Sequence, residues 1–309
     1  MSDTGSPLIL YVPGLLPKPA ARQHREALRR CLLEGVRRVD PALSDAIRRS
    51  DNSFDLVAWT YDFYREHRDI GQDEAAINAV IEQQAADDTD IREASSLMRR
   101  LTLFLYRMGD RLPFLIPHLA NERMEVHLQD LRRYYQNEDG AADRARELLK
   151  QRLRAAHETG RPVLLLAHSM GSVIAFDSLW QLSHKDHGEL HVDTWVTMGS
   201  PLGQNYLQKR ILGHAQSGRL RYPTNVGRWI NLAAVGDLTA IDPHLGNDFA
   251  EMVELGLVES IEDLSMFNYY RLDGQLNVHA EYGYLVNEVT GRIIADWWRK
   301  ITCPAPDSA

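Results

Sequence analysis

One serine in this chain lies where a backbone turn would make its hydroxyl reactive. Residues 163–167 form a short apolar run, which predicts a strand buried on both faces. Apolar residues recur at helical spacing from Val173 onward, so Ser169 must lie on a sharp turn between the strand and a helix. Such a turn lifts the hydroxyl clear of the sheet and directs the first N–H groups of the helix toward its reaction partner. The small residues Ala167 and Gly171 leave room for this turn.

A serine hydroxyl becomes a nucleophile when a neighbouring base removes its proton, and the usual base is a histidine oriented by a carboxylate. Among the 12 histidines, His279 follows the last predicted strand and precedes the last predicted helix. Asp237 follows the carboxyl end of a predicted strand and is the preferred acid. Asp242 remains the alternative acid and His244 the alternative base. An aspartate at either position that has no catalytic role would cap the segment that follows it. The preferred order along the chain is Ser169, Asp237, His279.

Acyl transfer at such a serine also needs backbone N–H donors for the charge that develops on the carbonyl oxygen. Met170, directly after the serine, is the first candidate. The second donor is expected in the loop after the predicted strand 8–12, where a glycine lets the backbone turn an N–H inward. Leu15 is the preferred second donor and Gly14 the alternative, because Pro13 has no N–H to donate.

Strand-like and helical segments alternate along the chain. This pattern predicts an α/β fold with a mostly parallel, doubly wound sheet covered by helices on both faces. In such sheets the reactive groups gather beyond the carboxyl ends of the strands. Strands are expected at residues 8–12, 54–60, 163–167, 195–198 and 229–235, with a hairpin within 267–278. Helices are expected at residues 20–36, 74–84, 94–108, 121–135, 139–157 and 282–301.

Residues 61–136 interrupt the alternation with a block of helices. We therefore predict a core built from residues 1–60 and 137–309, with residues 61–136 as a helical cap or insertion. One helix of the block carries an apolar stripe, which favours packing between helices. If the cap covers the serine, the same side chains would line an apolar pocket. The stripe consists of Leu97, Met98, Leu101, Phe104, Leu105 and Met108.

Composition limits the partners and the compartment. Of 309 residues, 44% are hydrophobic and 25% charged, which is typical of a globular protein with an extensive core. The net charge of −8 argues against nucleic acid as a partner. The 2 cysteines argue against a disulfide framework. No run reaches the roughly 20 apolar residues of a membrane span, and no signal peptide is recognisable. We therefore expect a cytoplasmic protein, while its oligomeric state stays open.

A small group of histidines and one aspartate has the composition of a metal site. Its members are His184, Asp186, His187 and His191. Gly188 breaks any helix between them and the stretch is charged, so a solvated loop is favoured over a metal site. No glycine spacing typical of a phosphate-binding loop is present. We therefore expect neither a metal nor an organic cofactor.

Together these motifs resemble the lipase-like serine esterase branch of the α/β-hydrolase superfamily. Alanine stands in the first glycine position of the G-x-S-x-G elbow, and Pro-Gly stands where lipases often have His-Gly. The matching positions are Pro13-Gly14, residues 167–171, Gly199-Ser-Pro-Leu202, Trp229-x-Asn231-x5-Asp237 and His279.

The resemblance implies an α/β-hydrolase fold and hydrolysis of carboxylic esters through a Ser-His-Asp triad and an acyl-enzyme intermediate. The substrate would be a small-molecule ester, a thioester or an acyl lipid, and the resemblance identifies neither the acyl chain nor the head group. The alternative is a catalytically silent protein of this fold that binds an apolar ligand or a partner.

Overall fold

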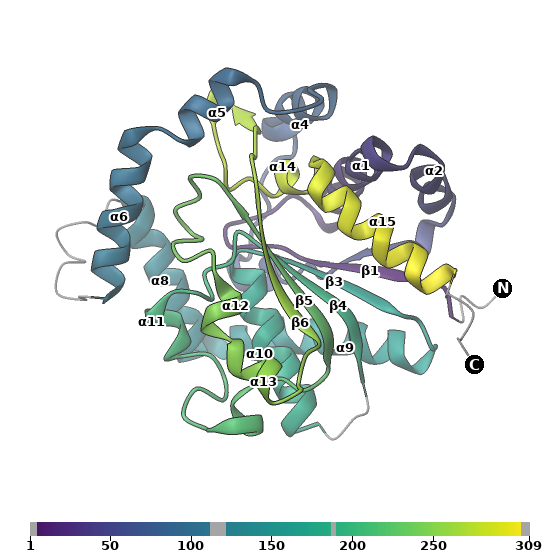
Figure 1. The fold of residues 1–309 in the computed structure, drawn as a ribbon, viewed down its shortest axis with the longest axis vertical. Coiled ribbons are helices and arrows are strands. Elements are labelled where there is room, and N and C mark those ends of the chain that lie inside the picture. The colour runs from purple at the N-terminus through teal and green to yellow at the C-terminus, as the bar shows by residue number, and fades with distance from the viewer. Residues whose placement is uncertain (1–4, 112–121, 187–189, 304–309) are drawn as a thin grey trace.

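The structure is a computed structural model that describes residues 5–111, 122–186 and 190–303. Six parallel strands form one sheet in the order β2-β1-β3-β4-β5-β6 (Figure 1). Helices cover both faces, so the prediction of an α/β fold with a parallel sheet is confirmed. The strands are β1 (Leu8–Val12), β2 (Phe54–Leu56), β3 (Val163–His168), β4 (Val192–Met198), β5 (Val226–Ala234) and β6 (Ser260–Met266).

Each face of the sheet is covered by its own layer of helices (Figure 1). One layer contains α9 (Ala141–Glu158) and α10 (Met170–His184), which pack on each other, and α10 also contacts β1 and β3. The other layer contains α1 (Ala21–Val39), α14 (Glu281–Val286) and α15 (Glu288–Thr302), with α2 (Pro41–Arg49) packed against α1. None of the helices in the described ranges is long and apolar enough to span a membrane.

Burial of the sheet on both faces explains the uninterrupted apolar runs of its central strands. Neighbouring side chains of a strand point to opposite faces, so Leu10 of β1 belongs to one core and Tyr11 to the other. Trp195 of β4 and Trp229 of β5 are fully buried in the first core, and their rings stack with centroids 4.3 Å apart. Because the strands are parallel, their carboxyl ends all lie at the same edge of this buried sheet.

The edge strand β6 is not predicted from the sequence. Its side chains are mostly half-buried and include Glu262 and Asp263, so it lacks the apolar run of a central strand. Asp263 instead accepts hydrogen bonds from the backbone N–H groups of Leu245 and Gly246, at 3.0 and 2.9 Å. The strand thereby holds the short helix α12 (Leu245–Asp248) at the open side of the sheet.

Three other boundaries differ from the sequence-based expectation. β2 stops at residue 56, and α3 (Thr60–Tyr64) begins where the strand was expected to end. The predicted hairpin is present but consists only of β7 (Arg271–Leu272) and β8 (Gln275–Leu276). The expected last helix is divided into α14 and α15, because the Asn287 side chain accepts the N–H of Val289 at 3.0 Å and starts a new helix.

The residue expected to cap α9 does not do so. Asp139 has a positive φ of 52° and belongs to a short turn of 3₁₀ helix, η3 (Glu138–Gly140). Helix α9 begins at Ala141, and Gly140 at its start also has a positive φ of 69°. Asn137, Asp139 and Gly140 all have positive φ, which requires a different turn from the simple aspartate cap.

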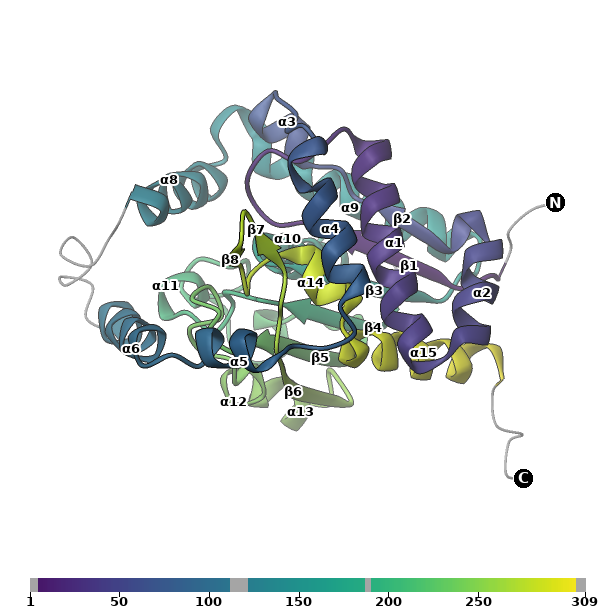
Figure 2. The same ribbon diagram turned by 90° about the horizontal axis from the view of Figure 1, so that it is seen from above.

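The segment between β2 and β3 is helical in its described parts. After α3 it contains α4 (Gly71–Glu82), α5 (Asp88–Ala94), α6 (Leu97–Arg111) and α8 (Glu122–Gln136). Helix α4 lies beside α1, whereas α6 and α8 lie on the side of the molecule opposite α2 (Figure 2). Helix α5 contacts β8, α6 contacts α11 (Asn205–Gln208), and α8 contacts α9.

The apolar stripe of α6 is open to solvent at its start. Leu97, Met98 and Leu101 are 81%, 71% and 52% exposed. The prediction that the stripe packs between helices is therefore wrong for these three side chains. The other three members of the stripe, Phe104, Leu105 and Met108, lie outside the residues whose side chains are described.

Candidate active site

Ser169 lies between the end of β3 and the first residue of α10. Its backbone has φ 53° and ψ −125°, a conformation that costs a non-glycine residue on the order of 1–3 kcal/mol. The Ser169 N–H donates to the carbonyl oxygen of Met198 in β4 at 2.9 Å. The sharp strand-to-helix turn inferred from the sequence is thus present, and the Ser169 residue is 7% exposed.

Two glycines let the backbone pack closely around this serine. A Cβ atom at Gly171 would clash with the carbonyl oxygens of Val12 and Pro13, so α10 can approach β1 only with glycine at this position. A Cβ atom at Gly14 would lie 2.8 Å from Ser169 Cβ and 3.3 Å from Ser169 Oγ. The loop after β1 therefore lies directly against the serine hydroxyl.

His279 connects Ser169 to Asp237 through hydrogen bonds. His279 Nε2 lies 3.0 Å from Ser169 Oγ, and His279 Nδ1 lies 2.8 Å from Asp237 Oδ2. A carboxylate only accepts hydrogen bonds, so Nδ1 carries the ring proton and Nε2 can accept the serine proton. The three side chains come from the ends of β3 and β5 and from the segment after β8, and the fold brings them together at the carboxyl edge of the sheet.

The Asp237 carboxylate is buried, with 2% exposure, and is held by further donors. The backbone N–H of Thr239 donates to Oδ1 at 2.8 Å, and the Tyr284 hydroxyl donates to Oδ2 at 2.8 Å. Burial alone would raise the pKa of this carboxyl. The nearby His279 and the hydrogen bonds outweigh burial, so the pKa of Asp237 lies below its ordinary value. Asp237 is therefore ionised at neutral pH and can orient the imidazole.

Gly199, at the end of β4, provides the space for the His279–Asp237 pair. Its φ is 56°, and a Cβ atom there would lie 2.8 Å from Asp237 Oδ2 and 3.0 Å from His279 Nδ1. Both the backbone conformation and the lack of space require glycine. The following residue, Ser200, shares a hydrogen bond of 2.8 Å with Ser172 of α10. The Gly-Ser-Pro-Leu pattern after β4 thus joins the end of β4 to the start of α10 at the candidate site.

His168, the residue before Ser169, supports the backbone that carries His279. Its Nε2 lies 2.8 Å from the carbonyl oxygen of His279 and, facing an acceptor, must carry the proton. Burial, reinforced by the neighbouring His279, lowers the pKa of His168 to about 3, so its ring is neutral at pH 7. The other ring nitrogen, Nδ1, is buried without a hydrogen-bond partner and would be 3.1 Å from a Cβ atom at Gly14.

Two of the three predicted oxyanion donors, Met170 and Gly14, lie next to the serine. Met170 is the first residue of α10, and the first N–H groups of a helix have no acceptor within it. Gly14 lies against the serine, and Leu15 packs at the margin of the core that contains α9 and α10. The N–H of Leu16 donates to the Tyr64 hydroxyl at 3.0 Å, so this N–H is not available as an oxyanion donor. Leu15 and Gly14 therefore both remain candidates for the second donor.

The alternative acid and base make other contacts. Asp242 Oδ1 accepts the backbone N–H of His244 at 3.2 Å, as a residue that caps a turn does. His244 is exposed and precedes α12. The hydrogen bond to the Nδ1 atom of His279 is made by Asp237.

Two described members of the histidine-rich stretch at the end of α10, His184 and Asp186, make hydrogen bonds with other parts of the protein. His184 Nε2 contacts the carbonyl oxygen of Tyr222 at 2.8 Å. Asp186 accepts hydrogen bonds from Lys150 and Arg154, at 3.1 and 2.6 Å. His187 lies outside the described residues. Within the part of the chain that the structure describes, no three His, Cys, Asp or Glu side chains are grouped so as to hold a metal ion.

Sequence reasoning did not assign a role to two side chains at this site. Tyr284 has no local signal, because its hydroxyl reaches Asp237 only when α14 folds back onto the end of β5. The same hydroxyl accepts the N–H of Ala234 at 2.8 Å, which fixes its position. His168 stands inside the serine motif, but the sequence does not show that its ring turns toward the backbone of His279.

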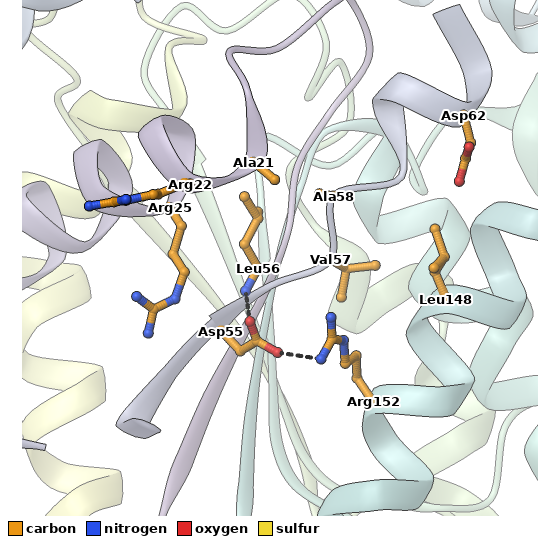
Figure 3. Close-up of a pocket in the computed structure, with 10 residues that line it drawn as sticks. All are labelled: Ala21, Arg22, Arg25, Asp55, Leu56, Val57, Ala58, Asp62, Leu148 and Arg152. Carbon is orange, nitrogen blue, oxygen red and sulfur yellow. Dashed lines mark hydrogen bonds and ion pairs between the residues drawn. The ribbon is translucent and has the colours of Figure 1, made fainter. Parts of the chain in front are cut away.

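A cavity of about 320 Å³ opens in another part of the molecule, between α1, the end of β2 and α9 (Figure 3). Charged side chains line much of it, among them Arg22, Arg25, Asp55, Asp62 and Arg152. Arg152 forms an ion pair with Asp55 at 3.3 Å, so opposite charges compensate each other there. None of the three candidate catalytic residues lines this cavity, which is therefore separate from the site at Ser169.

Comparisons of the chain with protein-family models, with curated proteins and with solved structures found no match. The chemistry of the site is therefore inferred from its own geometry.

Proposed function

We propose that the protein is a serine hydrolase of carboxylic esters, with an α/β-hydrolase fold similar to that of lipase-like serine esterases. The observation that carries the proposal is the hydrogen-bonded series from Ser169 Oγ through His279 to Asp237, with distances of 3.0 and 2.8 Å. The series begins on a strained strand-to-helix turn and ends at a buried carboxylate. Acyl transfer through a serine nucleophile commonly uses this combination of nucleophile, base and orienting acid.

In the first half of the proposed reaction, Ser169 Oγ attacks the carbonyl carbon of the ester while His279 Nε2 takes the hydroxyl proton. The N–H of Met170 and that of Leu15 or Gly14 stabilise the oxyanion of the tetrahedral intermediate. His279 then gives its proton to the departing alkoxide, so an alcohol leaves and the acyl group stays on Ser169. Asp237 keeps the imidazole in the correct tautomer and stabilises its cation.

In the second half, a water molecule replaces the alcohol. His279 takes a proton from this water, and the resulting hydroxide adds to the acyl carbon. The intermediate collapses with return of the proton from His279 to Ser169 Oγ, and the carboxylic acid leaves. These steps use only groups of the protein, the ester and water.

The proposal includes a division of the chain into a core, residues 1–60 and 137–309, and a cap, residues 61–136. Arg99 of α6 supports the position of the cap, because it donates to the carbonyl oxygens of Gly236 and Leu276 at 3.4 and 3.2 Å. These carbonyls precede Asp237 and His279 in the chain. The exposed apolar side chains at the start of α6 favour an ester with an apolar acyl group, as a small molecule, a thioester or an acyl lipid.

Labelling and kinetics test the proposal together. A fluorophosphonate probe is expected to modify Ser169, and the protein is expected to hydrolyse p-nitrophenyl esters. Ser169→Ala should abolish both while leaving the midpoint of thermal unfolding nearly unchanged. Turnover that persists in the purified Ser169→Ala protein would rule out the assignment. A wild-type protein that neither reacts with the probe nor hydrolyses esters from acetate to long-chain acyl groups would favour the silent, ligand-binding alternative.

A further inference from the structure

The carboxylate of Glu281 joins two segments of the candidate active site. Glu281 begins α14, shortly after His279, and is 5% exposed. Lys18, in the loop between β1 and α1, donates from Nζ to Glu281 Oε1 at 2.8 Å. His24 Nε2 of α1 lies 3.0 Å from the same oxygen, and the Tyr11 hydroxyl of β1 donates to Oε2 at 3.1 Å. Both carboxylate oxygens therefore have donors from the β1–α1 region.

This contact is an ion pair within a buried polar cluster. Burial alone would raise the pKa of Glu281, but Lys18 and His24 lower it, and the pKa lies well below its ordinary value. Burial lowers the pKa of His24, so His24 is a neutral donor and Lys18 supplies the balancing charge. The side chains of Lys18 and Glu281 are only 16% and 6% exposed. Apolar residues of similar volume often stabilise a fold as well as a buried ion pair does. What the ion pair adds is a fixed distance and direction between the two segments that it joins.

The ion pair connects the loop that lies against the serine with the segment that carries the base. Gly14 precedes Lys18 in this loop, and a Cβ atom at Gly14 would lie 3.3 Å from Ser169 Oγ. On the other side, His168 holds the carbonyl oxygen of His279 at 2.8 Å. The segment 279–281 is thus fixed at one end to β3 and at the other to the loop after β1.

We propose that Lys18 and Glu281 are positioning residues whose ion pair holds the loop of residues 13–18, with its oxyanion N–H donor, in place relative to Ser169 and His279. The inference rests on the proposed ester hydrolysis. Oxyanion donors act on charge that develops in the transition state, and a misplacement of about 1 Å can cost about 10²-fold in rate. Loosening the pair therefore lowers kcat and leaves KM nearly unchanged.

The test is a neutral double variant, Lys18→Met/Glu281→Gln, which leaves no charge buried without a partner. Its matched control is Lys150→Met/Asp186→Asn, which removes a Lys–Asp pair of 3.1 Å between α9 and the end of α10. We expect kcat for p-nitrophenyl ester hydrolysis to fall by about 10- to 100-fold in the Lys18/Glu281 variant, with KM within about threefold. The control should keep kcat within about twofold. Lys18→Arg in the otherwise wild-type protein retains the positive charge beside Glu281 and should keep most of the rate.

Hydrogen–deuterium exchange provides a readout that does not depend on activity. Peptides that cover residues 13–20 are expected to exchange faster in the Lys18/Glu281 variant than in the wild type and the control. An unchanged kcat, a change confined to KM, or unchanged exchange in these peptides would overturn the inference. If the wild type fails to hydrolyse esters and Ser169 fails to react with the fluorophosphonate, the proposed function fails. The exchange data alone then decide whether the ion pair holds the loop.

Discussion

Ser169 holds a backbone conformation that the residues next to it in the chain do not favour. Its φ of 53° and ψ of −125° lie outside the regions preferred by residues with a side chain. The surrounding structure imposes the conformation, through the hydrogen bond to Met198 and the close packing of Gly171 on the end of β1. A strained serine at a strand end is consistent with a side chain kept in place for chemistry at the expense of stability.

This strain gives a prediction for stability. Ser169→Gly is expected to be more stable than Ser169→Ala by about 1 kcal/mol, because glycine adopts this conformation with little steric cost and alanine does not. Both variants lack the hydroxyl, so the comparison isolates the backbone effect. Urea unfolding of the two proteins measures the difference. Equal midpoints and slopes would show that the turn is not strained.

The choice between two aspartates gives a second prediction at the residue scale. Asp237→Asn should lower kcat for ester hydrolysis by about 10⁴-fold, because asparagine no longer holds the correct histidine tautomer. Asp242→Asn is the matched control and should retain the rate, since Asp242 contacts the turn at His244 and not His279. Steady-state kinetics of both variants test this assignment. A large loss in Asp242→Asn with little loss in Asp237→Asn would transfer the role to Asp242.

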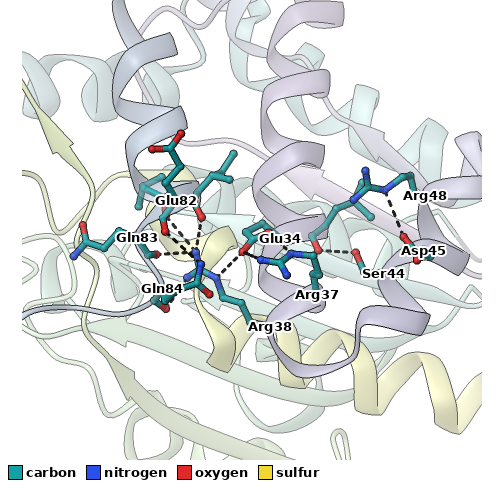
Figure 4. A network of polar contacts seen from close by, with 12 residues as sticks. Glu34, Arg37, Arg38, Ser44, Asp45, Arg48, Glu82, Gln83 and Gln84 are labelled. Atoms are coloured by element: carbon teal, nitrogen blue, oxygen red, sulfur yellow. Dashed lines mark hydrogen bonds and ion pairs between the residues drawn. The ribbon is translucent and has the colours of Figure 1, made fainter.

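At the scale of elements, one arginine attaches α4, the first long helix between β2 and β3, to α1 (Figure 4). Arg38 donates to the carbonyl oxygens of residues 80, 81, 83 and 84, at 2.9–3.3 Å, and to Glu34 at 3.1 Å. The last carbonyl groups of a helix have no partner within it. A single guanidinium therefore satisfies the end of α4 and fixes it to α1.

Replacing this arginine is expected to loosen α4. Arg38→Met should lower the free energy of unfolding by about 2–4 kcal/mol, because it leaves several carbonyl groups without their donor and removes one of the two charged partners of Glu34. Arg37→Met is the control: Arg37 also pairs with Glu34, but it is 47% exposed, and its loss should cost less than about 1 kcal/mol. Urea unfolding and hydrogen exchange of residues 71–84 provide the measurements. Similar losses in the two variants would refute the proposed anchoring role.

For the whole molecule, the buried histidines make stability depend on pH. The pKa of His168 is lowered to about 3 from an ordinary value of 6.5. The unfolded chain therefore binds a proton below about pH 6.5 that the folded protein does not bind. The contribution of neutral His168 to stability is fully present above this pH and is lost as pH falls. His24 acts in the same direction, and the lowered pKa values of Asp237 and Glu281 extend the loss to more acidic pH.

Comparison with a variant isolates the effect of His168. The free energy of unfolding of the wild type exceeds that of His168→Gln by an amount that should decrease by about 2 kcal/mol as the pH falls from 7 to 5. This figure follows because one pKa unit corresponds to about 1.4 kcal/mol. Asp177 provides the opposite sign: burial raises its pKa to about 6, so the advantage of the wild type over Asp177→Asn should decrease as pH rises from about 4 to 6. Urea unfolding across this range tests both. A His168→Gln difference that does not vary with pH would contradict the assignment of a neutral, buried ring.

The sequence by itself determined the central strands, the strand-to-helix turn at Ser169 and the small set of residues that could join it. Apolar runs, turn residues and changes of period are local properties of a chain, and β1, β3, β4 and β5 are buried strongly enough to show them. The edge strand β6 is half-exposed and mixed in polarity, so no local pattern marks it. The exposed start of α6 likewise does not follow from its stripe, because burial depends on which elements pack against a helix.

Only the tertiary structure decided which partners meet. It paired His279 with Asp237 rather than with Asp242, and it placed Tyr284 and Thr239 on that carboxylate. It also joined Lys18 to Glu281, although they lie far apart in the chain. Contacts of this kind depend on how loops are held at the end of a completed sheet. They cannot be predicted from local sequence, and the physical reason is that a contact between residues far apart in the chain produces no periodic pattern in the sequence around either of them.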